Sequence, residues 1–128
     1  MEFFRIVDIA INETEIQEKI QNHILSDIYS DIIVLDANLE LVKIGCIWGD
    51  FTLRRDKIKG GIRYSMLECP NALAWTITSG YPPARDKVVL HLTINRENKK
   101  KEFVDEINEF LDGWEMGLTA FFEKTVKL

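Results

Sequence analysis

The sequence predicts an α+β fold, a curved antiparallel sheet of about six to seven strands with an N-terminal helix and a long C-terminal helix packed on one face. Short stretches of alternating apolar and polar residues follow one another from about position 31 to 94. The turns between them are too short for a crossover, so neighbouring strands must be antiparallel. Apolar residues recur at helical spacing near each end of the chain. Residues 1–128 are expected to form one domain, because a chain of 128 residues can bury a core without disulfides or metal ions.

The expected elements begin with a strand at residues 3–11, which is rich in β-branched and aromatic side chains. Asn12 and Glu15 then have the spacing of a helix capping box. Isoleucines follow at every fourth position from Ile16 to Ile28. This spacing predicts a single helix over residues 13–29.

A meander of about six strands follows, with limits set by turn residues such as Gly49-Asp50 and Gly60-Gly61. The first of these strands is expected to be short and buried. A loop at residues 79–86, which contains two adjacent prolines, precedes the last one. The expected strands lie at residues 31–36, 39–48, 51–55, 62–66, 73–78 and 87–94.

The C-terminal helix is expected from about Asn98 to the end of the chain. Its apolar residues recur in steps of three and four and draw one stripe, which must lie on an apolar surface such as the sheet. The stripe consists of Phe103, Ile107, Phe110, Leu111, Trp114, Leu118 and Phe121. Gly113 and Gly117 lie inside the helix, where each costs about 1 kcal/mol relative to alanine. They predict close approach of the helix to the sheet, a kink, or a strip on which a partner packs.

The composition, with 46% hydrophobic and 29% charged residues, is that of an ordinary globular chain. No apolar run reaches the roughly 20 residues of a membrane span, and the N-terminus lacks the features of a secretory signal. We therefore expect cytoplasmic residence without membrane association. Cys46 and Cys69 are expected to stay reduced. The net charge of −5 disfavours non-specific binding to nucleic acid.

The sequence offers few groups for catalysis. His91-Leu92-Thr93 matches half of the paired His-x-Thr motif of 2H phosphoesterases, whose chemistry needs two motifs to place an acid and a base. The other histidine, His23, does not begin such a motif. Two histidines and two cysteines at wide spacing predict no zinc site, and no segment has the sequence of a phosphate-binding loop. We expect a protein that is not an enzyme and holds no cofactor and no metal.

Charge is distributed unevenly along the chain. From Glu102 onward, seven acidic side chains stand against two lysines. Residues 54–63 instead carry five basic side chains against Asp56 alone, with Tyr64 adjacent. Such a basic hairpin beside an aromatic ring is an alternative contact for phosphate or RNA, although these charges also suit a solvated sheet edge.

The acidic face of the C-terminal helix is the candidate partner-binding site. It consists of Glu102, Asp105, Glu106, Glu109 and Asp112. No lysine or arginine lies among them, so the carboxylates repel one another, whereas a face that serves only solubility intersperses lysines. A basic protein partner would relieve this repulsion and would associate faster through electrostatic steering.

In its layout, a small acidic α/β domain with terminal helices around a meander, the chain resembles the immunity proteins of bacterial contact-dependent growth inhibition systems. The resemblance is one of outline and covers the whole chain. It implies a non-catalytic protein that neutralises a basic, nuclease-type toxin by covering its active site or substrate surface. The acidic helix face would bind the toxin, and Tyr81 and Arg85 of the proline-containing loop would form a secondary contact.

The same outline is that of helix-grip folds, in which a small molecule or lipid lies in a cup between the sheet and the last helix. The two hypotheses differ in the volume left in this space. The side chains of Trp75, Phe103, Phe110, Trp114 and Phe121 are expected to fill it, which favours protein binding. The sequence leaves open the identity of the partner, the oligomeric state and the order of the strands.

Overall fold

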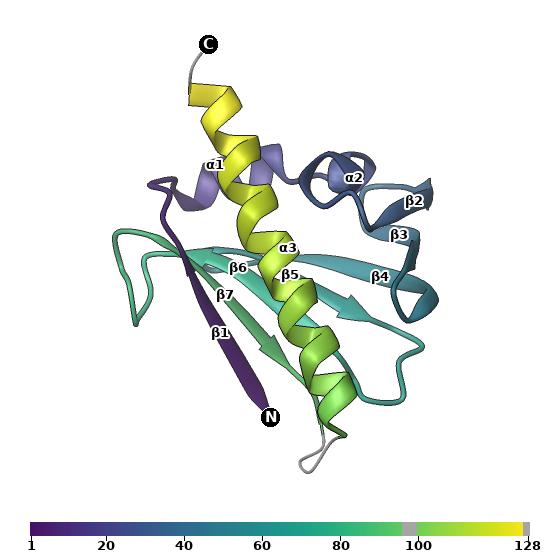
Figure 1. The fold of residues 1–128 in the computed structure, drawn as a ribbon. Helices are drawn as coiled ribbons and strands as arrows, with labels where there is room; N and C mark the ends of the chain where they lie inside the picture. Colours follow the sequence, from purple (N-terminus) through teal and green to yellow (C-terminus); the bar gives the residue numbers. More distant parts are fainter. Residues whose placement is uncertain (96–99, 127–128) are drawn as a thin grey trace.

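The structure of the protein is a computed structural model that describes residues 1–95 and 100–126, with side chains up to Glu123. Within these residues, seven strands form one antiparallel sheet in the order β1-β7-β6-β5-β4-β3-β2. The long helix α3 crosses one face of the sheet (Figure 1). This arrangement confirms the predicted α+β fold class.

The strands are β1 (Glu2–Val7), β2 (Ile33–Ala37), β3 (Leu41–Cys46), β4 (Gly49–Ile58), β5 (Gly61–Met66), β6 (Ala74–Ser79) and β7 (Val88–Thr93). The helical segments are α1 (Glu13–Lys19), the 3₁₀ turn η1 (Asn22–Ile24), α2 (Leu25–Ile28) and α3 (Lys101–Val126). Strands β2 to β7 form the predicted meander, and β1 returns to pair with β7. None of the helices among the described residues is both long enough and apolar enough to cross a membrane.

The core lies between the sheet and the helices. Tyr64 of β5 stands opposite Trp75 of β6, so both side chains point to the same face of the sheet. The ring of Trp75 lies 5.2 Å from that of Phe110 and 5.6 Å from that of Trp114, both on α3 (centroid distances). All four side chains are fully buried and occupy the space beneath α3.

The opposite face of the sheet, which we call the open face, carries Arg63, Thr76 and His91 at neighbouring register positions. Among the described residues, no helix covers it. Phe4 of β1 belongs to this face and stacks on the ring of His91, with centroids 4.3 Å apart. Alternation along each strand thus separates an apolar face from a mixed one.

The predicted single helix over residues 13–29 is wrong, because the chain leaves the helical conformation at Ile20 (φ −92°, ψ 86°). The capping box of Asn12 and Glu15 is formed as predicted. At the other end of α1, Arg55 donates from Nε to the carbonyl of Ile20 at 3.0 Å and from Nη2 to that of Gln17 at 2.6 Å. A continuous helix would use these carbonyls for its own hydrogen bonds. The buried guanidinium therefore replaces the next turn of the helix.

Strand β2 also differs from its prediction as a short buried strand. It lies at the edge of the sheet, and Ile33 is 60% exposed. The pairing with β3 shifts register between Val34 and Asp36, an irregularity typical of edge strands. A short apolar run has the same sequence signature at the edge as at the centre of a sheet.

Several helix and strand boundaries differ from the predicted ones by a few residues. The first strand ends at Val7, and the β3–β4 turn lies at residues 47–48, just before the predicted Gly49-Asp50. Gly49 begins β4 with a φ of +112°. On α3, Phe121, the last residue of the predicted stripe, is half-buried, whereas Phe122 next to it is buried. The predicted start of this helix, Asn98, lies outside the described residues.

Gly113 and Gly117 bring α3 against α2 rather than against the sheet. A Cβ atom at Gly117 would overlap the backbone carbonyl of Ile28, and one at Gly113 would overlap the ring of Tyr29. The predicted close approach of the helix is present at these glycines, but the prediction that the sheet is the neighbour is wrong. The two glycines face inward and offer no strip to a partner.

Candidate protein-binding surface

The outer face of α3 presents the predicted carboxylates to solvent. Glu102, Asp105, Glu109 and Asp112 are exposed and follow one another in steps of three and four, so they form one line along the helix. Glu106 lies beside this line and is half-buried. The apolar stripe of the same helix is held in the core, which fixes the orientation of the acidic line.

Two of the five carboxylates have a cationic partner. Asp105 pairs with Lys101 one turn earlier at 3.6 Å, and Asp112 pairs with Nε of Arg5 at 3.4 Å. Among the described residues, no cation lies within 4.0 Å of the other three, Glu102, Glu106 and Glu109. The basic segment of residues 54–63 neutralises none of the five.

Further negative charge lies beside this line on the segment that follows α2. The carboxylate of Asp31 acts on the hydroxyl of Tyr29 from the same segment, and the charge of Glu109 acts on it from α3. Burial, together with these two carboxylates, raises the pKa of Tyr29 to about 12. The negative potential of α3 therefore extends onto the neighbouring segment.

The structure does not bring Tyr81 together with the acidic face. The ring of Tyr81 packs on Gly60 and lines a hollow of about 410 Å³ on the open face, beside Phe4 and His91. Helix α3 covers the opposite face of the sheet. Arg85 is exposed in the same loop as Tyr81. One flat partner cannot contact both predicted sets of residues at once.

The five basic side chains of residues 54–63 do not form a single patch. Register places Arg54 and Arg63 on the open face, whereas Arg55 and Lys57 point to the side of α1. Arg54 pairs with Asp56 at 3.1 Å, and Arg63 donates to the hydroxyl of Ser65 at 2.8 Å. This division weakens the alternative of a basic hairpin for RNA.

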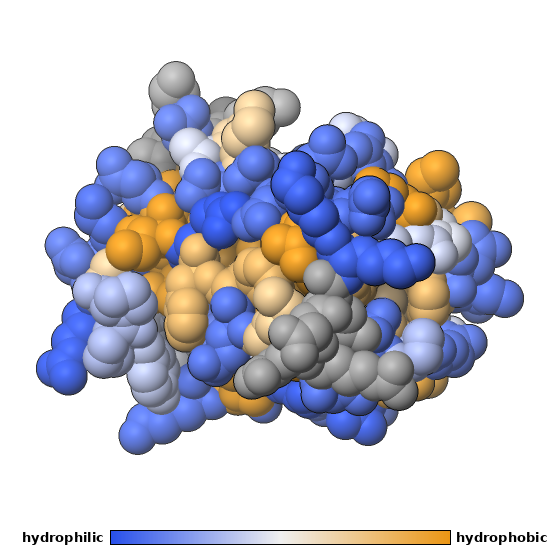
Figure 2. All heavy atoms as spheres, turned by 60° about the horizontal axis from the view of Figure 1, so that its bottom comes forward, coloured by the Kyte–Doolittle hydropathy of each residue, from blue (hydrophilic) through white to orange (hydrophobic). Residues whose placement is uncertain are grey.

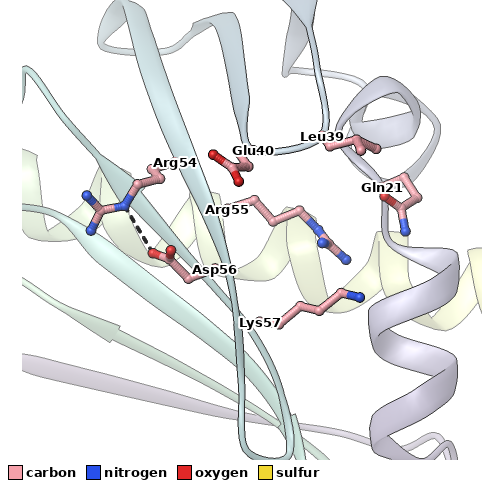
Figure 3. Close-up of a pocket in the computed structure, with 7 residues that line it drawn as sticks. All are labelled: Gln21, Leu39, Glu40, Arg54, Arg55, Asp56 and Lys57. Atoms are coloured by element: carbon pink, nitrogen blue, oxygen red, sulfur yellow. Dashed lines mark hydrogen bonds and ion pairs between the residues drawn. The ribbon is translucent and has the colours of Figure 1, made fainter.

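A hollow of about 440 Å³ lies between β4 and the end of α1. Arg55 and Lys57 point across it toward the side of Gln21 and α1 (Figure 3). Arg55 is only 7% exposed, and its Nε and Nη2 donate to the carbonyls that end α1. The hydroxyl of Tyr64 donates to Asn22 at 3.1 Å in the same buried network, and burial raises the pKa of this tyrosine. These groups hold the broken helix in place.

The described side chains that could act in catalysis or bind a metal do not gather in one place. His91 Nε2 lies 3.0 Å from Glu2 Oε1 at the end of the sheet, far in sequence from His23. Among the described residues, no three His, Cys, Asp or Glu side chains gather as a metal site requires. Burial raises the pKa of the free thiol of Cys46, which disfavours the reactive thiolate.

Sequence reasoning missed the apolar surface next to the acidic line. Met116 continues the line one turn after Asp112 and is 72% exposed. On β1, Ile6 is 45% exposed and, with Met116, lines a hollow between the strand and the helix. A separate group of hydrophobic side chains lies across the middle of the lower side of the molecule, where α3 begins, with hydrophilic ones above and below (Figure 2). An apolar residue at an outer helix position is the signal that would have revealed this surface.

No protein-family model matches the chain, and a search of curated proteins gave no match.

Proposed function

We propose that the protein is a cytoplasmic, non-catalytic binding module that neutralises a basic protein partner by covering it with the outer face of α3. The partner class we favour is a nuclease-type toxin, as for the immunity proteins that the chain resembles in outline. The observation that carries this proposal is the line of exposed carboxylates with the half-buried Glu106 beside it. Among the described residues, Glu102, Glu106 and Glu109 have no cationic partner.

The energetics of the helix support this assignment. Neighbouring carboxylates on a helix face cost a few tenths of a kcal/mol per pair when unbalanced. A basic partner turns this cost into attraction and accelerates encounter at low salt. The rigid attachment of α3 to the core through Trp114 and Phe110 keeps the line straight without the partner. The same buried rings occupy the space in which a helix-grip protein would hold its ligand, which favours protein binding over the lipid cup.

The test is co-expression with the product of the gene directly upstream. We expect the wild-type protein to restore growth of cells that this product harms. Reversal to lysine of the five carboxylates Glu102, Asp105, Glu106, Glu109 and Asp112 should abolish rescue while the variant remains folded by circular dichroism. The matched control has the same net charge and reverses five exposed acidic residues elsewhere, namely Glu18, Asp27, Asp36, Glu40 and Asp86.

The control variant should rescue growth as well as wild type. Two results would count against the proposal. A harmless upstream product would remove the toxin partner, and unimpaired rescue by the variant reversed on α3 would remove the proposed surface.

A further inference from the structure

The hollow between β1 and the second half of α3 has a volume of about 440 Å³ and combines apolar and acidic groups. Ile6, Met116 and Ala120 form its apolar part, and Asp8, Glu115 and Glu123 bring carboxylates to it. Because Asp112 and Met116 are one turn apart on the same line of α3, the hollow continues the acidic face.

Several of the acidic and apolar groups of the hollow lack a partner in the folded protein. Asp8 pairs with Lys87 at 3.2 Å. Glu115 and Glu123 have no cationic partner within 4.0 Å among the described side chains. Met116 exposes 72% of its surface in a region where every neighbouring outer position is polar or small. An occupant must therefore offer both an aliphatic surface and a positive charge.

We propose that this hollow receives an arginine side chain of the basic partner, an inference that rests on the proposed function. The aliphatic stem of arginine can pack on Met116 and Ile6 while its guanidinium reaches the carboxylates of Glu115 and Glu123. Lysine offers a stem but only a compact, strongly hydrated charge, and arginine is enriched among the residues that dominate interfaces. The hollow is the anchor point of the interface, and the carboxylates from Glu102 to Asp112 steer the partner toward it.

Three peptides test this inference without the natural partner: acetylated hexa-arginine amide, the hexa-lysine equivalent and the uncharged hexa-citrulline equivalent. The protein carries ¹³C-methyl methionine, and its three methionines give three signals. We expect hexa-arginine to shift the Met116 methyl signal in a saturable way and to leave that of buried Met66 unchanged. Hexa-lysine should bind more weakly, and hexa-citrulline should give no shift.

Variants then separate the hollow from the rest of the acidic surface. Glu115→Gln with Glu123→Gln, and separately Met116→Ala, should each weaken hexa-arginine binding at least about tenfold, as expected for an anchor residue. Glu18→Gln on α1 and Leu39→Ala on the β2–β3 turn, whose leucine is 80% exposed, are the matched controls and should have little effect. Peptide affinity is measured by fluorescence anisotropy.

The inference is overturned if the Met116 signal does not move, if lysine binds as well as arginine, or if the control variants weaken binding equally. In a second sample labelled with ¹⁵N, shifts confined to amides between Glu102 and Asp112 would place the cation on the first half of α3, which overturns the hollow and leaves the proposed function standing. Failure of the proposed function appears separately, as absence of rescue by the wild-type protein in the growth assay.

Discussion

Arg55 is the residue whose role differs most from its appearance in the sequence. It stands in a run of basic residues, yet it is buried and donates to the carbonyls of Gln17 and Ile20 at the end of α1. A positive group at a helix C-terminus is favourable because it complements the helix dipole and the unpaired carbonyls. Arg54, next to it, is a surface residue paired with Asp56.

We predict that Arg55→Met lowers the free energy of unfolding by about 1–3 kcal/mol, because it leaves the buried carbonyl of Ile20 without a donor, whereas that of Gln17 still accepts from Nε2 of Gln21. The neighbouring substitution Arg54→Met removes an exposed ion pair and should cost at most about 1 kcal/mol. Urea denaturation of the two variants measures the difference. Equal losses would mean that the guanidinium of Arg55 does not close the helix.

Tyr29 reports on the acidic surface through its ionisation. In the folded state, burial and the carboxylates of Asp31 and Glu109 raise its pKa from 10.0 to about 12. Between pH 10 and about 12, the folded protein therefore retains the hydroxyl proton of Tyr29, whereas the unfolded chain loses it. This contribution to stability is complete below pH 10 and is lost as the pH rises toward 12.

We predict that Glu109→Gln lowers the pKa of Tyr29, because it removes one of the charges that oppose the tyrosinate. Ultraviolet absorbance of tyrosinate during alkaline titration measures this, with Tyr29→Phe to assign the signal and circular dichroism to define the range in which the fold persists. Glu102→Gln, about two turns away on the helix, should leave the titration unchanged. If the Glu109→Gln and Glu102→Gln variants gave identical titration curves, Glu109 would not face Tyr29.

At the scale of elements, α3 could be predicted because its pattern is local, with one apolar stripe and one acidic line set by helical spacing. The break after α1 could not, because its cause is Arg55, which is distant in sequence. The exposure of β2 follows from its place at the edge of the sheet, which periodicity does not contain. Because helical spacing is local, four of the five carboxylates were placed correctly on the exposed face of α3, with Glu106 half-buried beside them. Tyr81, whose position depends on sheet topology, lies on the other side of the sheet.

The contact between α3 and α2 gives a prediction on element packing. Gly117→Ala should destabilise the protein by about 1–3 kcal/mol, because the added methyl group overlaps the carbonyl of Ile28 and must push α2 away. Helix propensity alone would give the opposite sign, a gain of about 1 kcal/mol. Thermal and urea unfolding measure the change, and Met116→Ala, at an exposed position of the same helix, is the control. A stabilised Gly117→Ala variant would show that the two helices are not in contact.

For the whole molecule, the balance of charge decides how stability responds to salt. The chain has a net charge of −5, and only two of the five predicted carboxylates on α3 are paired with a cation among the described residues. Repulsion between exposed like charges weakens as the Debye length shrinks from about 30 Å at 0.01 M salt to 3 Å at 1 M. Exposed ion pairs also weaken, but each contributes little. Repulsion therefore dominates the response.

We predict that the free energy of unfolding rises by a few tenths of a kcal/mol to about 1 kcal/mol between low and high sodium chloride. The double variant Glu106→Gln, Glu109→Gln should be more stable than wild type at low salt and should respond less to salt, because part of the repulsion is already absent. The comparison of the two proteins removes the general effect of salt on hydrophobic burial, which both share. If wild type and variant respond equally, the carboxylates of α3 do not repel one another in the free protein. The energetic reason for assigning them to a basic partner would then be lost.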